Sequence, residues 1–251
     1  MPYFLCDEPI QLSKNFFLRG AELKHLRLSR KIRKGEKIEV QDPEKKRFLC
    51  LVTEVQNAFI ILSPIEALSL EKEWPPWFQI YIPPLKEKAL DFIFQKATEL
   101  NGAEIHLYPC QNSQALPNGQ KLQSRLERWS KICLEACKQS GRSSPPKIIP
   151  HPSFDHALEQ AKNQGGELFC FHPQGSMLGK NLGWEDNFSE KGKGISLFIG
   201  PEGGFTEKEL CLFPNPPYQL PFPILRAETA ALACLTLFQF FLASKMEPKK
   251  S

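Results

Sequence analysis

The sequence predicts an α/β protein, in which a small β-rich segment is followed by a larger segment of alternating strands and helices. Before residue 71, short runs of Leu, Val, Phe and Ile are separated by turn residues, which is typical of β-strands. From residue 78 onward, short apolar runs alternate with amphipathic runs of helical period. Such alternation favours a largely parallel sheet with helices on both faces. We therefore expect two domains, residues 1–70 and residues 71–251.

The first segment is expected to form three strands and one short helix. Gly35 and the Asp42–Pro43 pair supply turns. Proline and tryptophan are concentrated in residues 64–77, which we interpret as a linker. The expected strands are residues 37–40, 47–55 and 58–62, and the expected helix is residues 21–30.

The second segment is expected to contain at least four strands and four helices. Ser153 has the position of a helix N-cap, and the Gly165–Gly166 pair ends that helix. The apolar residues of the run 86–100 share one helical face. The expected strands are residues 78–82, 104–108, 167–171 and 195–199, and the other expected helices span residues 122–136 and 230–243.

Composition excludes several classes of protein. Hydrophobic residues are 41% and charged residues 24% of the 251 residues, which argues against a disordered or fibrous protein. The apolar stretch 230–243 is shorter than the roughly 20 residues of a membrane span, so a buried helix is expected there. The N-terminus lacks the features of a secretory signal, and we expect a cytoplasmic protein. Eight scattered cysteines without zinc-type spacing predict reduced core cysteines and no metal site.

Basic residues are concentrated in two places, although the net charge is only +4. Residues 14–47 contain 12 Lys and Arg against 5 Asp and Glu, a net +7. Residues 121–147 contain 7 against 2, a net +5. Two such segments favour a polyanionic partner, and a solvated charged face is the alternative interpretation.

Ligands of parallel sheets bind beyond the carboxyl ends of the strands, and three such ends contain chemically informative residues. The first is Phe171–His172–Pro173, the second is the glycine-rich loop 200–204, and the third is the segment 220–230. In the third, Arg226, Glu228 and Thr229 open an otherwise apolar helix, which is a common place for a site. An ordinary helix N-terminus, in which Glu228 favours the helix dipole, is the alternative.

The glycine-rich loop precedes a well-defined helix start, because Thr206 and Glu209 have the spacing of a capping box. Its glycines let a ligand approach the backbone closely. However, Glu202 would repel a phosphate, and the Gly-Lys-Ser/Thr of a P-loop is absent. A neutral or cationic ligand with adenine and ribose edges therefore fits better. A tight strand–helix connection without a ligand is the alternative.

Two motifs in this order resemble one family. Ile-Gly-Pro-Glu-Gly-Gly-Phe-Thr at residues 199–206 and Ile-Leu-Arg-Ala-Glu-Thr-Ala at residues 224–230 resemble the RsmE family, the ribosomal RNA small subunit methyltransferase E group of the SPOUT superfamily. Weaker matches extend the resemblance along most of the chain. They are residues 95–100, Arg128–Trp129, Glu135–Ala136, residues 139–142, and His25–Leu26 with Arg30, Gly35 and Asp42.

The resemblance implies an N-terminal PUA-like RNA-binding β-barrel, residues 1–70, and a C-terminal SPOUT methyltransferase domain with a trefoil knot, residues 71–251. It implies a homodimer that binds S-adenosylmethionine in the knot and methylates uridine N3 in 16S rRNA of the small ribosomal subunit, with no membrane or metal partner. The implied cofactor-binding residues are Phe171, His172, Ile199, Gly200, Gly203, Gly204, Leu220, Ile224, Leu225, Arg226, Thr229 and Ala230.

Uridine N3 becomes a good nucleophile only as its proton leaves. A cation near O2 or O4 stabilises the developing anion, and Arg226 is the expected one. Glu228 or Glu202 is the expected proton acceptor. Alternatively, Glu202 holds its loop and Glu228 caps its helix. RNA is expected to contact the basic segment 14–47 and residues 138–142, and the expected RNA-binding residues are His25, Arg27, Arg30, Lys31, Lys96, Gln139 and Arg142.

The chain departs from the family pattern in several places. Leu220 is followed by Pro221–Phe222–Pro223 where a glycine is usual, which removes backbone donors and stiffens the loop. Asn112–Ser113 remains where Arg-Ser is usual, and Tyr3 stands where arginine is common. A catalytically weak RNA-binding member of the same fold is therefore one alternative. An unrelated α/β nucleotide enzyme is a second, disfavoured by Glu202 and by the missing P-loop lysine.

Overall fold

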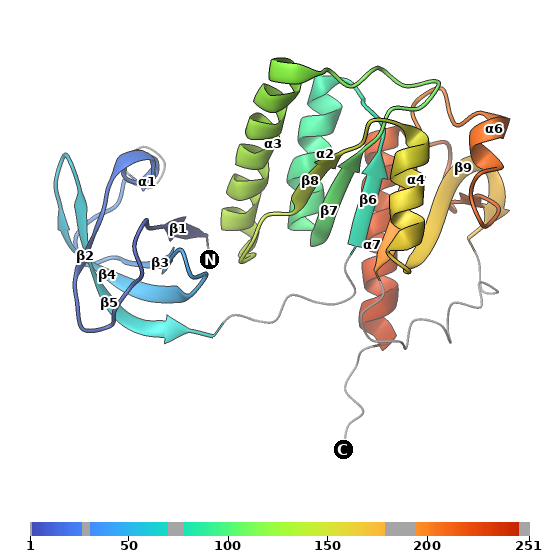
Figure 1. The fold of residues 1–251 in the computed structure, drawn as a ribbon. Helices are drawn as coiled ribbons and strands as arrows, with labels where there is room; N and C mark the ends of the chain where they lie inside the picture. Colours follow the sequence, from blue (N-terminus) through green and yellow to red (C-terminus); the bar gives the residue numbers. More distant parts are fainter. Residues whose placement is uncertain (1, 27–30, 70–77, 179–193, 246–251) are drawn as a thin grey trace. The chain divides into compact units, whose positions relative to one another are not determined.

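The structure is a computed structural model that describes residues 2–26, 31–69, 78–178 and 194–245 (Figure 1). The chain divides into two units. The first unit is Met1–Glu73 together with Cys137–Ser144, and the second is Trp74–Ala136 together with Pro145–Ser251.

A curled mixed sheet of five strands, in the order β1-β3-β4-β5-β2, forms the first unit. β1 runs parallel to β3, and the other neighbours are antiparallel. Alternate residues of β3 and β4, such as Ile38 and Cys50, point into a common apolar core. The elements are β1 (Tyr3–Leu5), β2 (Phe16–Leu18), α1 (Gly20–His25), β3 (Lys37–Gln41), β4 (Arg47–Val55) and β5 (Ile60–Leu68).

β5 differs from the expectation of a linker that begins at residue 64. The strand continues through Pro64 to Leu68. Pro64 lies opposite Cys50, next to an irregularity in the pairing of β4 and β5. A strand tolerates proline at such a place, because the regular hydrogen-bonding pattern is already interrupted there and needs no amide donor. Residues 70–77 of the expected linker and residues 27–30 of the expected helix lie outside the described residues.

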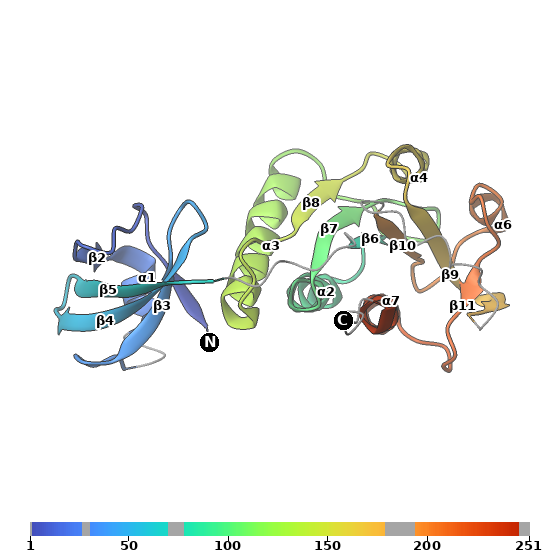
Figure 2. The same cartoon turned by 90° about the horizontal axis from the view of Figure 1, so that it is seen from below.

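The second unit is built on six strands in the order β11-β9-β10-β6-β7-β8, and every described pair of neighbours is parallel. α2 and α7 cover one face of this sheet and α4 the other (Figure 2). The predicted parallel sheet with helices on both faces is therefore confirmed. The elements are β6 (Phe78–Ile82), α2 (Glu87–Glu99), β7 (Gly102–Leu107), α3 (Gly119–Ser140, whose residues from Cys137 onward belong to the first unit), β8 (Lys147–Pro150), α4 (Phe154–Asn163), β9 (Glu167–Met177), β10 (Ile195–Ile199), α6 (Glu207–Leu210), β11 (Tyr218–Gln219) and α7 (Ala227–Lys245).

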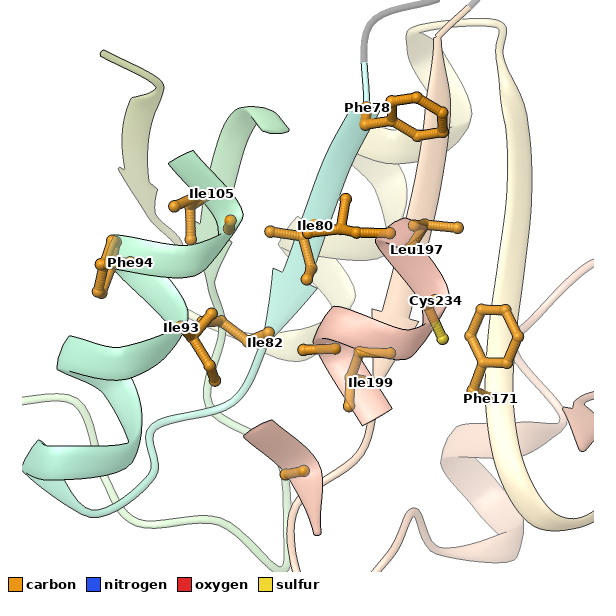
Figure 3. Close-up of a cluster of buried hydrophobic side chains, with 14 of the residues drawn as sticks. Phe78, Ile80, Ile82, Ile93, Phe94, Ile105, Phe171, Leu197, Ile199 and Cys234 are labelled. Atoms are coloured by element: carbon orange, nitrogen blue, oxygen red, sulfur yellow. The ribbon is translucent and has the colours of Figure 1, made fainter. Parts of the chain in front are cut away.

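Residues of the central strands serve the two faces alternately. Ile80 of β6 and Leu197 of β10 are paired in register and contribute to the core beneath α2 and α7 (Figure 3). The next pair, Tyr81 and Phe198, belongs to the core beneath α4, where their rings stack with centroids 4.1 Å apart. β10 is buried along its whole length, as its largely apolar run predicts, and its one polar side chain, Ser196, donates to Gln79 of β6 at 2.9 Å.

Two elements at the C-terminal end of the sheet are longer than expected. β9 continues to Met177 because β11 pairs with its last residues, Ser176 and Met177. α7 begins at Ala227, one turn before the expected start at residue 230. Among the described residues, none of the helices combines the length and the apolar character that a membrane span requires.

Candidate functional site

A cavity of about 530 Å³ lies where β10 ends and β9 continues past it. Its wall comes from three segments that are far apart in the sequence: residues 171–174, residues 199–204 and residues 218–230. The volume is within the range of about 300–1,000 Å³ that is usual for small-molecule sites. The three strand ends that the sequence predicts as a site thus line one hollow.

Nearly all of the expected cofactor-binding residues line this cavity. The exception is Thr229, which is exposed in the first turn of α7. Of the expected catalytic residues, Arg226 and Glu202 line the cavity and Glu228 does not. Three lining residues lie outside the predicted segments, and their only signal is that they adjoin them: Gln174, Tyr218 and Gln219.

The glycine-rich loop is a tight turn whose last residue must be glycine. Gly204 has φ +70°, and its amide donates to the carbonyl of Pro201 at 2.9 Å. A side chain disfavours this backbone conformation. A Cβ at Gly204 would also lie 3.4 Å from Nε2 of His172, so the imidazole rests directly against this glycine.

The stretch that follows β7 holds the glycine-rich loop from outside. The Tyr108 hydroxyl donates to the carbonyl of Ile199 at 2.7 Å. The Asn112 amide donates to the carbonyls of Gly203 at 3.2 Å and Gly204 at 3.1 Å. Burial raises the pKa of Tyr108 well above its ordinary value, so the hydroxyl keeps the proton it donates. We call these two donors, Tyr108 and Asn112, the loop clasp.

Glu209 of α6 joins the same two segments. It is 8% exposed, and its carboxylate accepts hydrogen bonds from the amide of Thr206 at 2.8 Å and the amide of Gln111 at 2.9 Å. The Thr206 hydroxyl in turn accepts from the amide of Glu209 at 3.3 Å. The predicted capping box is therefore confirmed, and its carboxylate also anchors the stretch after β7.

The electrostatics of the cavity depend on few groups. Glu202 and Arg226 are the formally charged residues that line it, and both are exposed. The Nδ1 atom of His172 accepts from the amide of Gln174 at 3.2 Å, which leaves the proton of the neutral ring on Nε2. Burial lowers the pKa of His172, so the ring is uncharged at neutral pH.

The segment between β11 and α7 follows the irregular path that its prolines impose. The Phe222 amide donates to the carbonyl of Leu220 at 2.8 Å, which closes a narrow turn. Phe222 and Ile224 are 44% and 85% exposed. Pro221 and Pro223 have no amide hydrogen, so this wall of the cavity offers a ligand few backbone donors.

The expectation that both basic segments contact RNA is wrong for two residues. Arg47 is 5% exposed, and its guanidinium donates to the carbonyls of Gly141 at 3.1 Å and Arg142 at 3.2 Å. Lys138 is 3% exposed and donates to Glu22 at 2.7 Å. These two cations stabilise the first unit, and neither is available to a phosphate.

The expected RNA-binding residues have varied surroundings. Gln139 and Lys31 are exposed, and Lys31 has φ 48°. Lys96 forms an ion pair with Glu99 at 2.8 Å. Arg142 is half-buried, and its carbonyl accepts from the hydroxyl of Tyr3 at 2.7 Å. Arg27 and Arg30 lie outside the described residues, as does the side chain of His25.

A chain of three imidazoles lies beneath α4, apart from the residues that line the cavity. Nδ1 of His106 lies 2.8 Å from Nε2 of His151, and Nδ1 of His151 lies 3.0 Å from Nδ1 of His156. Nε2 of His106 lies 3.1 Å from Glu104, whose pKa this bond lowers. Burial, together with the two neighbouring rings, lowers the pKa of His151 to about 4. Within the described part of the chain, no cluster of three or more His, Cys, Asp or Glu residues has a metal-binding arrangement.

Comparison with known proteins extends these observations. A family model described as RNA methyltransferase domain matches residues 72–239. The chain is similar to ribosomal RNA small subunit methyltransferase E 2 of Borreliella burgdorferi, with 27% identity over 96% of this chain and 98% of the relative. It is 28% identical to ribosomal RNA small subunit methyltransferase E of Bacillus subtilis, over 94% of both chains.

One solved structure shows the fold. It is ribosomal RNA small subunit methyltransferase E of Neisseria gonorrhoeae bound to S-adenosylmethionine, which superposes with a TM-score of 0.76 at 24% identity. The match covers 96% of this chain and 98% of that chain. These similarities confirm the resemblance that the motifs at residues 199–206 and 224–230 indicate.

Proposed function

Because the chain belongs to the RNA methyltransferase domain family, we propose that it transfers a methyl group from S-adenosylmethionine to N3 of a uridine in 16S rRNA of the small ribosomal subunit. The observation that carries the proposal is the cavity beyond β10, which the family motifs line. The names of the relatives support an rRNA substrate, and with that substrate a cytoplasmic location.

The residues of the cavity fit a positively charged methyl donor. Phe171, Leu220 and Leu225 supply apolar surface, and the glycine-rich loop lets adenosine approach the backbone. The neutral His172 does not repel a sulfonium, and the Glu202 carboxylate favours one. When bound, S-adenosylmethionine would supply a methyl group whose carbon a nucleophile attacks in line with the bond to sulfur, which breaks as the thioether leaves.

Arg226 and Glu202 are the residues that we assign to the reacting base. Arg226 lies immediately before α7 and lines the cavity with an exposed side chain, so its guanidinium can stabilise negative charge on the uracil oxygens. Glu202 lines the same cavity and is the preferred proton acceptor. Glu228 does not line it, and its place in the first turn of α7 supports the helix-dipole role. The target base must be unpaired, because N3 lies on its Watson–Crick edge.

We also propose the two domain folds that the family resemblance implies, because the observed arrangement of strands and helices supports them. The curled five-stranded sheet supports a PUA-like RNA-binding domain over residues 1–70. The return of α7 against β10 and β6, after the chain has passed through α6 and β11, supports a SPOUT domain with a trefoil knot over residues 71–251. The expected cofactor-binding and RNA-binding residues keep those roles in the proposal, and within the two basic segments Arg47 and Lys138 are excluded because they are buried.

A homodimer is proposed from the apolar surface of α7 and α2. α7 is apolar on nearly all sides, which is typical of a helix that is buried on every side by other parts of the protein. Phe240 of α7 is nevertheless 74% exposed, and Phe92 of α2, which packs beside α7, is 44% exposed. If the wild type sediments as a dimer and Phe240→Glu as a monomer, the result would support a second copy of the chain bound to the apolar surface of α7 and α2.

The decisive experiment is tritium transfer from labelled S-adenosylmethionine to small-subunit particles that lack the modification, followed by nucleoside analysis. Label in 3-methyluridine of the 16S rRNA is the expected result. Label in another nucleoside would overturn the assigned position. Cofactor binding without any transfer would favour the alternative, a catalytically weak RNA-binding member of the fold, which the prolines at residues 221 and 223 keep open.

A further inference from the structure

Phe17 is an aromatic side chain that the fold leaves in solvent. It lies in β2 between Phe16 and Leu18, whose side chains pack on the core of the first unit. Because successive side chains of a strand point to opposite faces, Phe17 points away from that core. It is 50% exposed. Packing of the first unit therefore does not account for an aromatic residue at this position.

Two further side chains gather around Phe17. Leu18 pairs with Ile60 in the antiparallel ladder of β2 and β5, which brings Phe59 beside β2. The rings of Phe17 and Phe59 meet edge to face, with centroids 5.3 Å apart and an interplanar angle of 84°. The guanidinium carbon of Arg19 lies 4.9 Å from the centroid of the Phe17 ring. We call Phe17, Arg19 and Phe59 the aromatic–arginine cluster.

The local structure gives Arg19 no other role. Arg19 is the N-cap residue of α1, a position that favours Ser, Thr, Asp or Asn. Its side chain forms no capping hydrogen bond. A cation at this end of a helix is disfavoured by the helix dipole. The contact with the Phe17 ring is therefore what the arginine side chain contributes at this position.

The chain around the cluster is positively charged in solvent. Lys14, Arg19 and Lys24 are exposed, and none of them forms an ion pair with a carboxylate among the residues that the structure describes. The one carboxylate between residues 14 and 24 is Glu22, and it is held by Lys138 at 2.7 Å. The free charges of this stretch are all cationic, so the cluster suits an anionic partner.

We propose that the aromatic–arginine cluster is a stacking platform for an unpaired base of an RNA strand. Every base has a π-face that an aromatic ring can stack on, whatever the sequence. The guanidinium of Arg19 can stack on the same base and neutralise a neighbouring phosphate. An acidic peptide would use the cations and leave the rings unused. The proposal rests on the proposed function, because that function supplies the RNA, and it adds base stacking to the contacts that are expected of the basic segment 14–47.

The test measures binding of a short fluorescein-labelled single-stranded RNA by fluorescence anisotropy. Phe17→Ala should raise the dissociation constant roughly five- to a hundredfold, the range that loss of one stacked base produces. Phe17→Leu, which stays apolar but loses the ring, should show a comparable loss, and Phe17→Trp should retain affinity. The matched control is Ile65→Ala, because Ile65 is 44% exposed in the neighbouring strand β5, and it should bind like the wild type. Thermal unfolding checks that all variants fold alike.

Two outcomes would overturn the platform. In the first, Phe17→Ala binds the RNA as the wild type does. In the second, Phe17→Leu keeps full affinity while Phe17→Ala loses it, which indicates a general apolar contact of the kind a protein partner makes. Methyl transfer by the wild type to small-subunit particles is measured in parallel. Transfer together with an unaffected Phe17→Ala refutes the platform and leaves the proposed function standing. Ring-dependent RNA binding without transfer refutes the function and leaves the platform standing.

Discussion

Replacement of Asn112 by alanine should weaken the binding of S-adenosylmethionine while the protein stays folded. The Asn112 amide donates to the carbonyls of Gly203 at 3.2 Å and Gly204 at 3.1 Å, and both of these residues line the cavity. A typical hydrogen bond contributes about 0.5–1.5 kcal/mol net, and these are solvent-accessible, so about 1–2 kcal/mol for the pair is reasonable. Without the Asn112 hydrogen bonds the glycine-rich loop is less ordered before the cofactor binds, and part of the binding free energy is then used to order it. Since about 1.4 kcal/mol is tenfold in affinity, the dissociation constant should rise roughly five- to thirtyfold.

Isothermal titration calorimetry with S-adenosylmethionine measures this change directly. Asn112→Asp keeps the size of the side chain but cannot donate, and it should lose at least as much affinity as Asn112→Ala. The control is Asn163→Ala, because Asn163 is an exposed asparagine at the end of α4, away from the cavity lining. Wild-type affinity in Asn112→Ala, or an equal loss in Asn163→Ala, would refute the reasoning.

Four further outcomes are expected. A Cβ at Gly203 would lie 3.0 Å from Cβ of Asn112, so Gly203→Val should push the clasp outward and abolish cofactor binding, and calorimetry showing normal affinity would contradict this. A Cβ at Gly175 would lie 2.5 Å from a backbone carbonyl oxygen next to β11, so Gly175→Ala should lower the free energy of unfolding by about 1–3 kcal/mol, measured by urea titration. Burial lowers the pKa of His151 from 6.5 to about 4, so the unfolded chain binds more protons and the urea midpoint should fall as pH drops from 6.5 toward 4. The slope should be shallower in His151→Gln, and a flat wild-type profile would exclude the mechanism. Arg226→Gln should lower the methyl-transfer rate at saturating cofactor about a hundredfold, and an unchanged rate would remove Arg226 from catalysis.

Local signals in the sequence predicted many elements of the second unit. Ser153 caps α4 as expected, with its hydroxyl accepting from the amide of His156 at 3.2 Å. β10 spans Ile195–Ile199, the bounds that its apolar run predicts. β8 and β11 were not predicted, because strands of four and two residues show no periodicity of their own and exist by pairing with longer neighbours.

The place of the candidate site was predictable because parallel strands end at one edge of their sheet. The contacts that hold the site were not. Asn112 and Gly203 are 91 residues apart, and nothing in either neighbourhood indicates the bond between them. For Arg47 the sequence led to a wrong prediction. A basic residue in a basic segment was expected in solvent, but Arg47 is buried against the carbonyls of Gly141 and Arg142. The number of charged residues in a segment does not reveal which cations are buried and hydrogen-bonded within the folded protein.

The imidazole chain beneath α4 has a fixed polarity. Glu104 accepts from Nε2 of His106, so a neutral His106 must accept at Nδ1 from His151, and His151 must accept at Nδ1 from His156. Every ring nitrogen is then occupied except Nε2 of the exposed His156. The row therefore links β7, through His151, to the first turn of α4 by a directional series of hydrogen bonds.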